Sequence, residues 1–193
     1  MITVSGVNVA VRKPLTVPEF LAWEERQELP YEFDGWQPVA MTGGTIAHDL
    51  ITFNIRKALD VGLAGGRCQT FGPDVKIAAG DTVSYPDAIV ACTPQRNTSI
   101  IVEAPVVVFE VLSVDMSRTD RIDKVRDYLK AATIHRYAIL EQDGVAAAVF
   151  ERKADGWRVV TLTADGVLSM PEIDISLLLA ECYIGVEVAA SGG

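Results

Sequence analysis

The sequence predicts an α/β fold in which a mixed central β-sheet is flanked by helices and carries antiparallel hairpins. Two amphipathic segments, 46–63 and 117–133, interrupt a series of short apolar strands instead of alternating strictly with them. Asp-Gly pairs separate several of the strands, which is typical of hairpin turns. Helices that precede and interrupt runs of strands favour a mixed, partly antiparallel sheet over an all-parallel one.

The bulk composition is that of an ordinary soluble globular protein. The chain has 193 residues, of which 49% are hydrophobic and 22% charged, enough for one domain with a real core. A net charge of −9 argues against non-specific coating of nucleic acid or of acidic membranes. No uncharged apolar run approaches the roughly 20 residues that span a bilayer, so we expect no membrane partner.

The cysteines and the N-terminus suggest a cytoplasmic protein. Cys68, Cys92 and Cys182 lie far apart and form no CxxC pair. Such an odd, unpatterned set predicts reduced thiols. The first 15 residues contain no apolar core after a basic start, so we expect no signal peptide.

The N-terminal elements are marked by caps and turns. Thr16 and Glu19 form a capping box that predicts a helix start. Asp34-Gly35 predicts a hairpin turn between strands at 31–33 and 36–41. The next segment, 46–63, has an apolar stripe at helical spacing, formed by Ile51, Ile55, Ala58 and Leu59.

The rest of the chain reads as strands around a second helix. Strands are expected at 68–71, 75–78, 84–91, 106–112, 135–141, 145–152 and 157–163. The helix predicted at 117–133 has an apolar stripe of Ile122, Val125, Leu129 and Ala132. The closing segment, 175–183, is expected to be helical.

Familiar catalytic motifs are absent, and two carboxylates stand in unusual places. There is no phosphate loop, GxGxxG or GxSxG pattern, and two histidines are too few for a multi-histidine zinc site. Glu110 interrupts the apolar run "VVVFEVL", and Asp87 follows Pro86 where an apolar strand begins. A lone buried carboxylate costs several kcal/mol unless it is neutralised, paired or metal-bound. Two on neighbouring strands would repel each other unless a divalent cation such as Mg²⁺ lay between them.

The segment that follows Glu110 in the sequence is locally basic. Residues 117–137 hold six basic against three acidic side chains. Lys124 and Tyr128 are four residues apart and share a helix face that borders the core stripe, so Lys124 can reach the sheet. Two carboxylates, a metal and a lysine are the groups that metal-assisted phosphodiester hydrolysis uses.

The segments "YPDAIV", "APVVVFEVLS" and "DRIDKVRDYL" together resemble the Uma-two-like endonucleases of the PD-(D/E)XK nuclease superfamily. Asp87 matches the Pro-Asp half of the superfamily pattern and Glu110 its second acid. Leu112 occupies the usual lysine position, and Lys124 matches a lysine that this group carries on the following helix. Further matches are Glu32 in "YEFDGW", His48 in "TIAHDL" and the closing "MPEIDISLLL".

The resemblance implies a restriction-endonuclease-like core from about 16 to 183, within a single domain of 1–193 that has flexible tails at 1–12 and 188–193. It implies Mg²⁺-dependent DNA cleavage, with Mn²⁺ as a possible substitute. Asp87, Glu110 and the Val111 carbonyl would hold the metal. Lys124 would be the catalytic lysine, with Glu32 and His48 beside it. The chain departs from the family at "ATIHRYA", where Ala138 replaces an aromatic residue.

Simpler interpretations of the same residues stay open. Glu110 could be a structural carboxylate paired with Lys124, Asp87 a turn residue, Glu32 a hairpin surface residue and His48 a core-edge histidine. "PDVK" at 73–76 also contains a Pro-Asp and an acid-x-Lys, but one aspartate cannot serve as both halves of the motif.

Three functions fit this sequence. The first is a DNA endonuclease, in which a homodimer could pool basic surfaces on an acidic chain. The second is a catalytically inactive nuclease-fold module for binding or assembly. The third is hydrolysis of RNA or a nucleotide, which the sequence does not separate from the first.

Overall fold

The computed structural model describes residues 15–41, 43–112 and 118–187, with the backbone alone at 118–121. The tails expected at 1–12 and 188–193 lie outside the described residues. Within these ranges, no helix combines the length and the apolar character needed to cross a membrane.

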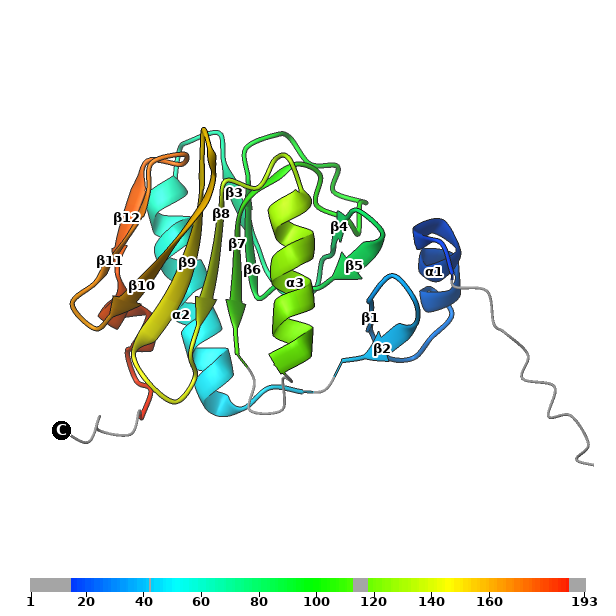
Figure 1. Cartoon of the computed structure of the whole chain (residues 1–193), viewed down its shortest axis with the longest axis horizontal. Helices are drawn as coiled ribbons and strands as arrows, with labels where there is room; N and C mark the ends of the chain where they lie inside the picture. Colours follow the sequence, from blue (N-terminus) through cyan, green and yellow to red (C-terminus); the bar gives the residue numbers. More distant parts are fainter. Residues whose placement is uncertain (1–14, 42, 113–117, 188–193) are drawn as a thin grey trace, which may run out of the picture.

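A six-stranded mixed sheet forms the centre of the molecule (Figure 1), which confirms the predicted fold class. Its strand order is β10-β9-β8-β7-β6-β3, and only the β7–β8 pair is parallel. The strands are β3 (Gln69–Phe71), β6 (Ala88–Ala91), β7 (Pro105–Val111), β8 (Arg136–Leu140), β9 (Ala146–Lys153) and β10 (Gly156–Thr163).

Two helices cover opposite faces of this sheet (Figure 1): α2 (Ile46–Leu63) and α3 (Arg118–Lys130). Alternate residues of β7 point to the two faces. Val107, Phe109 and Val111 belong to the same core cluster as the α2 stripe, whereas Val108 packs with Tyr128 of α3. This alternation places Glu110, two residues after Val108, on the α3 face.

A smaller sheet, of order β2-β1-β5-β4, lies beside the central one (Figure 1), and helix α1 (Val17–Glu24) packs against it through Phe20, which clusters with Phe33 and Val83. Its strands are β1 (Tyr31–Phe33), β2 (Pro38–Ala40), β4 (Ile77–Ala79) and β5 (Thr82–Ser84). The predicted capping box is present, and Phe20 stacks on Phe33 with ring centroids 5.0 Å apart. Strand β2 begins later than predicted because the Asp34 side chain accepts hydrogen bonds from the backbone of Trp36 and Gln37.

Three predicted elements are wrong in part. The strand expected at 84–91 is two strands, β5 and β6, because Pro86 has no N–H for a ladder and the chain passes between sheets there. The segment 175–183 begins as β12 (Ile175–Leu178), paired with β11 (Val167–Met170), and only Leu179–Tyr183 is helical, as a 3₁₀ turn. The helix expected at 117–133 ends at Lys130, so Ala132 of its predicted stripe lies beyond α3; Ile122 is exposed, and Tyr128 is buried instead.

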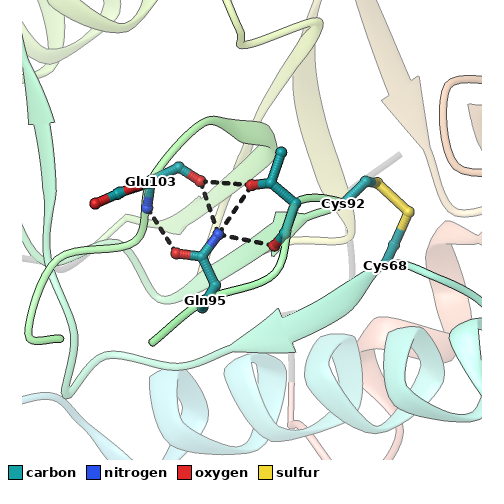
Figure 2. The surroundings of a disulfide bond; sticks show 5 residues. Cys68, Cys92, Gln95 and Glu103 are labelled. Carbon is teal, nitrogen blue, oxygen red and sulfur yellow. Dashed lines mark hydrogen bonds between the residues drawn. A yellow bond between two sulfur atoms is a disulfide. The ribbon is translucent and has the colours of Figure 1, made fainter. Parts of the chain in front are cut away.

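The expectation of three reduced thiols is also wrong, since Cys68 and Cys92 form a disulfide (Figure 2). The residues flank the antiparallel β3–β6 pair, in which Gln69 lies opposite Ala91. Cross-strand pairing therefore brings together two cysteines that are 24 residues apart in the sequence. Cys182 is free and buried. The cysteine argument for a cytoplasmic location no longer holds.

Reduction of this disulfide is expected to lower the free energy of unfolding by about 2 kcal/mol, at the low end of the range for loops of this size. The bond restricts the unfolded chain between two residues that are 24 positions apart. Denaturant melts with and without reductant measure the effect. The free energy of unfolding of the double variant Cys68→Ser/Cys92→Ser should not change when reductant is added. A wild type that is equally stable with and without reductant would contradict the prediction.

Candidate active site

Glu110 lies at the centre of a buried polar cluster between β7 and α3. The residue is only 3% exposed. Its Oε1 accepts hydrogen bonds from the Tyr128 hydroxyl at 2.9 Å and from Lys124 Nζ at 3.3 Å. Both donors come from successive turns of α3, so the helix presents its polar i, i+4 pair to the one acid of the strand. The predicted approach of Lys124 to the sheet is present.

Lys124 joins two carboxylates from distant parts of the chain. Its Nζ lies 2.9 Å from Glu32 Oε1 and 3.3 Å from Glu110 Oε1, and its side chain is 16% exposed. Burial by itself would lower the pKa of this amine, but the charges of Glu110 and Glu32 outweigh burial and raise it. The ammonium is therefore kept charged across the physiological pH range.

Glu110 is the carboxylate of the cluster whose ionised form its surroundings disfavour. Burial is the largest effect and raises its pKa, Lys124 and Tyr128 lower it, and the neighbouring charges of Asp87 and Glu32 raise it, so that the pKa of Glu110 is about 7. One lysine does not neutralise three convergent carboxylates. An additional cation would lower the free energy of the ionised form.

Asp87 is held at the start of β6 by its backbone and its side chain. Its N–H donates to the Phe109 carbonyl at 3.1 Å, and its Oδ2 accepts the Val111 N–H at 2.7 Å. The second oxygen, Oδ1, lies 3.3 Å from His48 Nε2. Since Val111 follows Glu110 directly, these bonds fix Asp87 beside the second acid.

The remaining two predicted residues flank the site from opposite sides. Glu32, on β1, accepts the Tyr85 N–H at 3.1 Å through the same Oε1 that Lys124 contacts. His48 lies in the first turn of α2, which Thr45 caps. The pKa of His48 is raised, and the largest cause is the hydrogen bond to Asp87, whereas burial acts in the opposite direction. The imidazole is therefore protonated more readily beside that carboxylate.

The donor set fits a hard cation such as Mg²⁺ or Mn²⁺. Carboxylate oxygens of Asp87 and Glu110 and a backbone carbonyl of Val111 are ligands that these ions prefer. Among the described residues, no three or more His, Cys, Asp or Glu side chains are grouped to hold an ion by themselves. An ion here would need oxygens from backbone, water or substrate as well, which is usual for Mg²⁺.

A cavity of about 120 Å³ lies beside this cluster, between α3, β5 and the β1–β2 hairpin. Glu32, Lys124 and Tyr128 line one part of it, and Val39 and Val83 supply apolar surface. The cavity gives a substrate group room next to the Lys124 ammonium.

Sequence reasoning missed several supporting contacts. Tyr128 was placed on the same helix face as Lys124 without a contact of its own, and its hydroxyl hydrogen-bonds Glu110 directly. Its spacing from Lys124 was a usable signal. Gln142, which is buried, donates to the Leu112 carbonyl at 3.2 Å and accepts the Thr45 hydroxyl. Nothing local in the sequence indicates that Gln142 links the end of β7 to the cap of α2.

Comparison with known proteins gives a consistent result. Residues 17–180 match the Uma2 family, described as "Putative restriction endonuclease". Two uncharacterized proteins of Synechocystis are similar: slr1290 is 30% identical over 89% of this chain and 93% of its own length, and sll1609 is 24% identical over 88% and 97%.

The crystal structure of a "putative nuclease belonging to DUF820" from Anabaena variabilis has the same fold. It superposes with a TM-score of 0.75 at 18% identity, covering 89% of this chain and 98% of that one. The family match extends over most of the chain and takes in Glu32, His48, Asp87, Glu110 and Lys124. From the match and from its relatives over nearly their whole length, this chain is a member of the Uma2 family.

Proposed function

We propose that this chain is a metal-dependent endonuclease that hydrolyses phosphodiester bonds in DNA. The observation that carries the proposal is the convergence on Lys124 of Glu110 and Glu32, with Asp87 hydrogen-bonded to the residue after Glu110. These groups come from β7, α3, β1 and the start of β6. Family membership supports the reaction class.

Asp87, Glu110 and the Val111 carbonyl would hold Mg²⁺ or Mn²⁺. When bound, such an ion polarises the phosphate and lowers the pKa of a water. The raised pKa of Glu110 favours this role, because a carboxylate that burial and like charges disfavour gains most from a cation.

The other side chains have distinct roles. Lys124 stays protonated and can offer its ammonium to the charge that builds on the phosphate. Glu32 orients that ammonium and can accept a proton or a hydrogen bond from water on the same side. His48 holds Asp87 in position through Oδ1. Tyr128 fixes the rotamer of Glu110.

DNA binding has to overcome an acidic chain, whose net charge is −9. A second copy that pools basic surfaces would supply part of the missing affinity, so we propose that the active form is a homodimer on DNA. Salt would then weaken binding steeply.

Plasmid cleavage in Mg²⁺ or Mn²⁺ tests the proposal. The isosteric variants Asp87→Asn and Glu110→Gln are each expected to lose at least about 100-fold in rate, the loss typical when a charged catalytic group is removed. Asp74→Asn, in the turn of the competing "PDVK" motif, is the matched control and should retain wild-type activity. Equal activity in all four proteins would place the reaction elsewhere. No cleavage of DNA by wild type, with cleavage of RNA or of nothing, would favour the other two functions.

A further inference from the structure

The lysine of "PDVK" does not face the proposed active site but belongs to a second buried cluster. Lys76, Glu24 and Tyr85 are 7%, 5% and 9% exposed. Glu24 Oε2 forms an ion pair with Lys76 Nζ, and Oε1 accepts the Tyr85 hydroxyl at 2.6 Å. Glu24 also accepts the Tyr31 N–H at 3.0 Å, and Lys76 Nζ lies 5.3 Å from the centre of the Tyr85 ring. We call Lys76, Glu24 and Tyr85 the buried triad.

The triad is anchored on three elements. Glu24 is the last residue of α1, and Lys76 precedes β4. The Lys76 backbone is bound on both sides, since its N–H donates to Ile100 and its carbonyl accepts from Val102. Tyr85 follows β5, so its ring is held from α1 and from the β4 side together.

Tyr85 leads directly to the proposed site through its own backbone. Its N–H donates to Glu32 Oε1, the atom that also contacts Lys124. The next two residues are Pro86, which restricts the chain, and Asp87. A shift of Tyr85 would therefore move a hydrogen-bond donor of Glu32 and the attachment point of Asp87.

We propose that Tyr85 is a positioning residue: its side chain, fixed in the buried triad with Lys76 and Glu24, sets the placement of Glu32 and Asp87 around Lys124. The effect of this placement on catalysis rests on the proposed function. The contacts that link Tyr85 to Lys124 through Glu32 do not depend on it. The triad thereby gives the "PDVK" lysine a role outside the metal site.

The reactivity of the Lys124 amine measures this coupling without any nuclease assay. Tyr85→Phe removes the hydroxyl that binds Glu24, and we expect Lys124 to be acetylated by acetic anhydride at least about threefold faster, since a less constrained Glu32 stabilises the ammonium less. Mass spectrometry of peptic fragments gives the rate. Tyr31→Phe is the matched control, because it removes a tyrosine hydroxyl in the same region that takes no part in the triad, and it should leave the rate unchanged.

Two further measurements separate positioning from stability alone. In a Glu32→Gln background, Tyr85→Phe should add little to the labelling rate, because both act through one oxygen. In cleavage assays, Tyr85→Phe should lower kcat about tenfold with KM for DNA unchanged. A variant that melts at a lower temperature yet keeps wild-type labelling and kcat would overturn the inference. Faster labelling in a protein whose wild type cleaves nothing would uphold the coupling and reject the proposed function.

Discussion

In a Lys124→Met variant, DNA cleavage is expected to fall about 1000-fold, which corresponds to roughly 4 kcal/mol of lost transition-state stabilisation. The side chain keeps its length and loses its charge. No other basic side chain in the described part of the chain forms an ion pair with Glu110 or Glu32. A neutral residue there leaves the reacting phosphate without the one ammonium that this cluster supplies.

The same variant should unfold more easily, by about 3 to 5 kcal/mol at neutral pH, the usual cost of leaving a buried charge without its partner. Glu110 would remain under α3 beside Glu32 and Asp87, with only the Tyr128 hydroxyl to bind. Protonation of Glu110 relieves part of this cost, so the deficit should shrink as the pH falls. Urea melts at two pH values measure it.

Lys130→Met provides the matched control for both effects. Lys130 is on the same helix, but its side chain is 64% exposed and its Nζ lies 3.4 Å from Asp127. Its removal should change stability by no more than about 0.5 kcal/mol and leave cleavage intact, because exposed ion pairs contribute little. If Lys124→Met and Lys130→Met behaved alike, Lys124 would be an ordinary surface lysine.

The elements with strong local signals could be predicted from the sequence. The capping box of Thr16 and the apolar stripe of Ile51, Ile55 and Leu59 gave two helices, and the second has the predicted bounds. The central strand around Glu110 was identified because a short apolar run between Pro105 and Ser113 is typical of a strand that is covered on both faces. In each case, the information lies within one or two helical turns or one strand.

The failures arise where a residue's partner is distant in the sequence. The buried stripe of α3 was misplaced because the pattern of polar and apolar residues assigns Ile122 to the core, although its side chain is exposed, and places Lys124 only at the border of the stripe. Two carboxylates from β1 and β7 make its burial favourable. The Cys68–Cys92 bond depends on the register of β3 against β6, which no spacing rule supplies. The segment around Ile175 is apolar enough for a helix or a strand, and pairing with β11 decides in favour of the strand.

In the proposed site, too, some residues have a local signal in the sequence and others depend on distant partners. Asp87 and Glu110 stand out locally, as acids where apolar strands begin or run. Lys124, Glu32 and His48 were assigned through a resemblance, because a helix lysine, a hairpin acid and a lone histidine have common structural roles. Tyr85 had no signal of its own, and Lys76 stood out only in the competing "PDVK" motif, since the importance of both comes from Glu24, which lies more than fifty residues away.

The metal-free protein is expected to lose stability as the pH rises from about 5 to 8, through Glu110. Its folded-state pKa is about 7, above the ordinary value of 4.5. A carboxyl group with a raised pKa binds its proton more tightly in the folded state, so its stabilising effect is complete below pH 4.5 and is lost as the pH passes 7. A shift of this size corresponds to about 3 kcal/mol.

The difference in unfolding free energy between wild type and Glu110→Gln isolates this effect, because His48 and the other groups titrate in both proteins. Wild type should lose about 2.5 kcal/mol relative to the variant between pH 5 and pH 8, since a small part of the effect is already lost at pH 5. Added Mg²⁺ should restore much of that loss at pH 8 and little of it at pH 5, since only the ionised carboxylate binds the cation. A difference independent of pH would mean that Lys124 and Tyr128 fully compensate the buried charge. A pH-dependent difference that Mg²⁺ leaves unchanged would mean that Glu110 is a structural acid and that the proposed metal site is wrong.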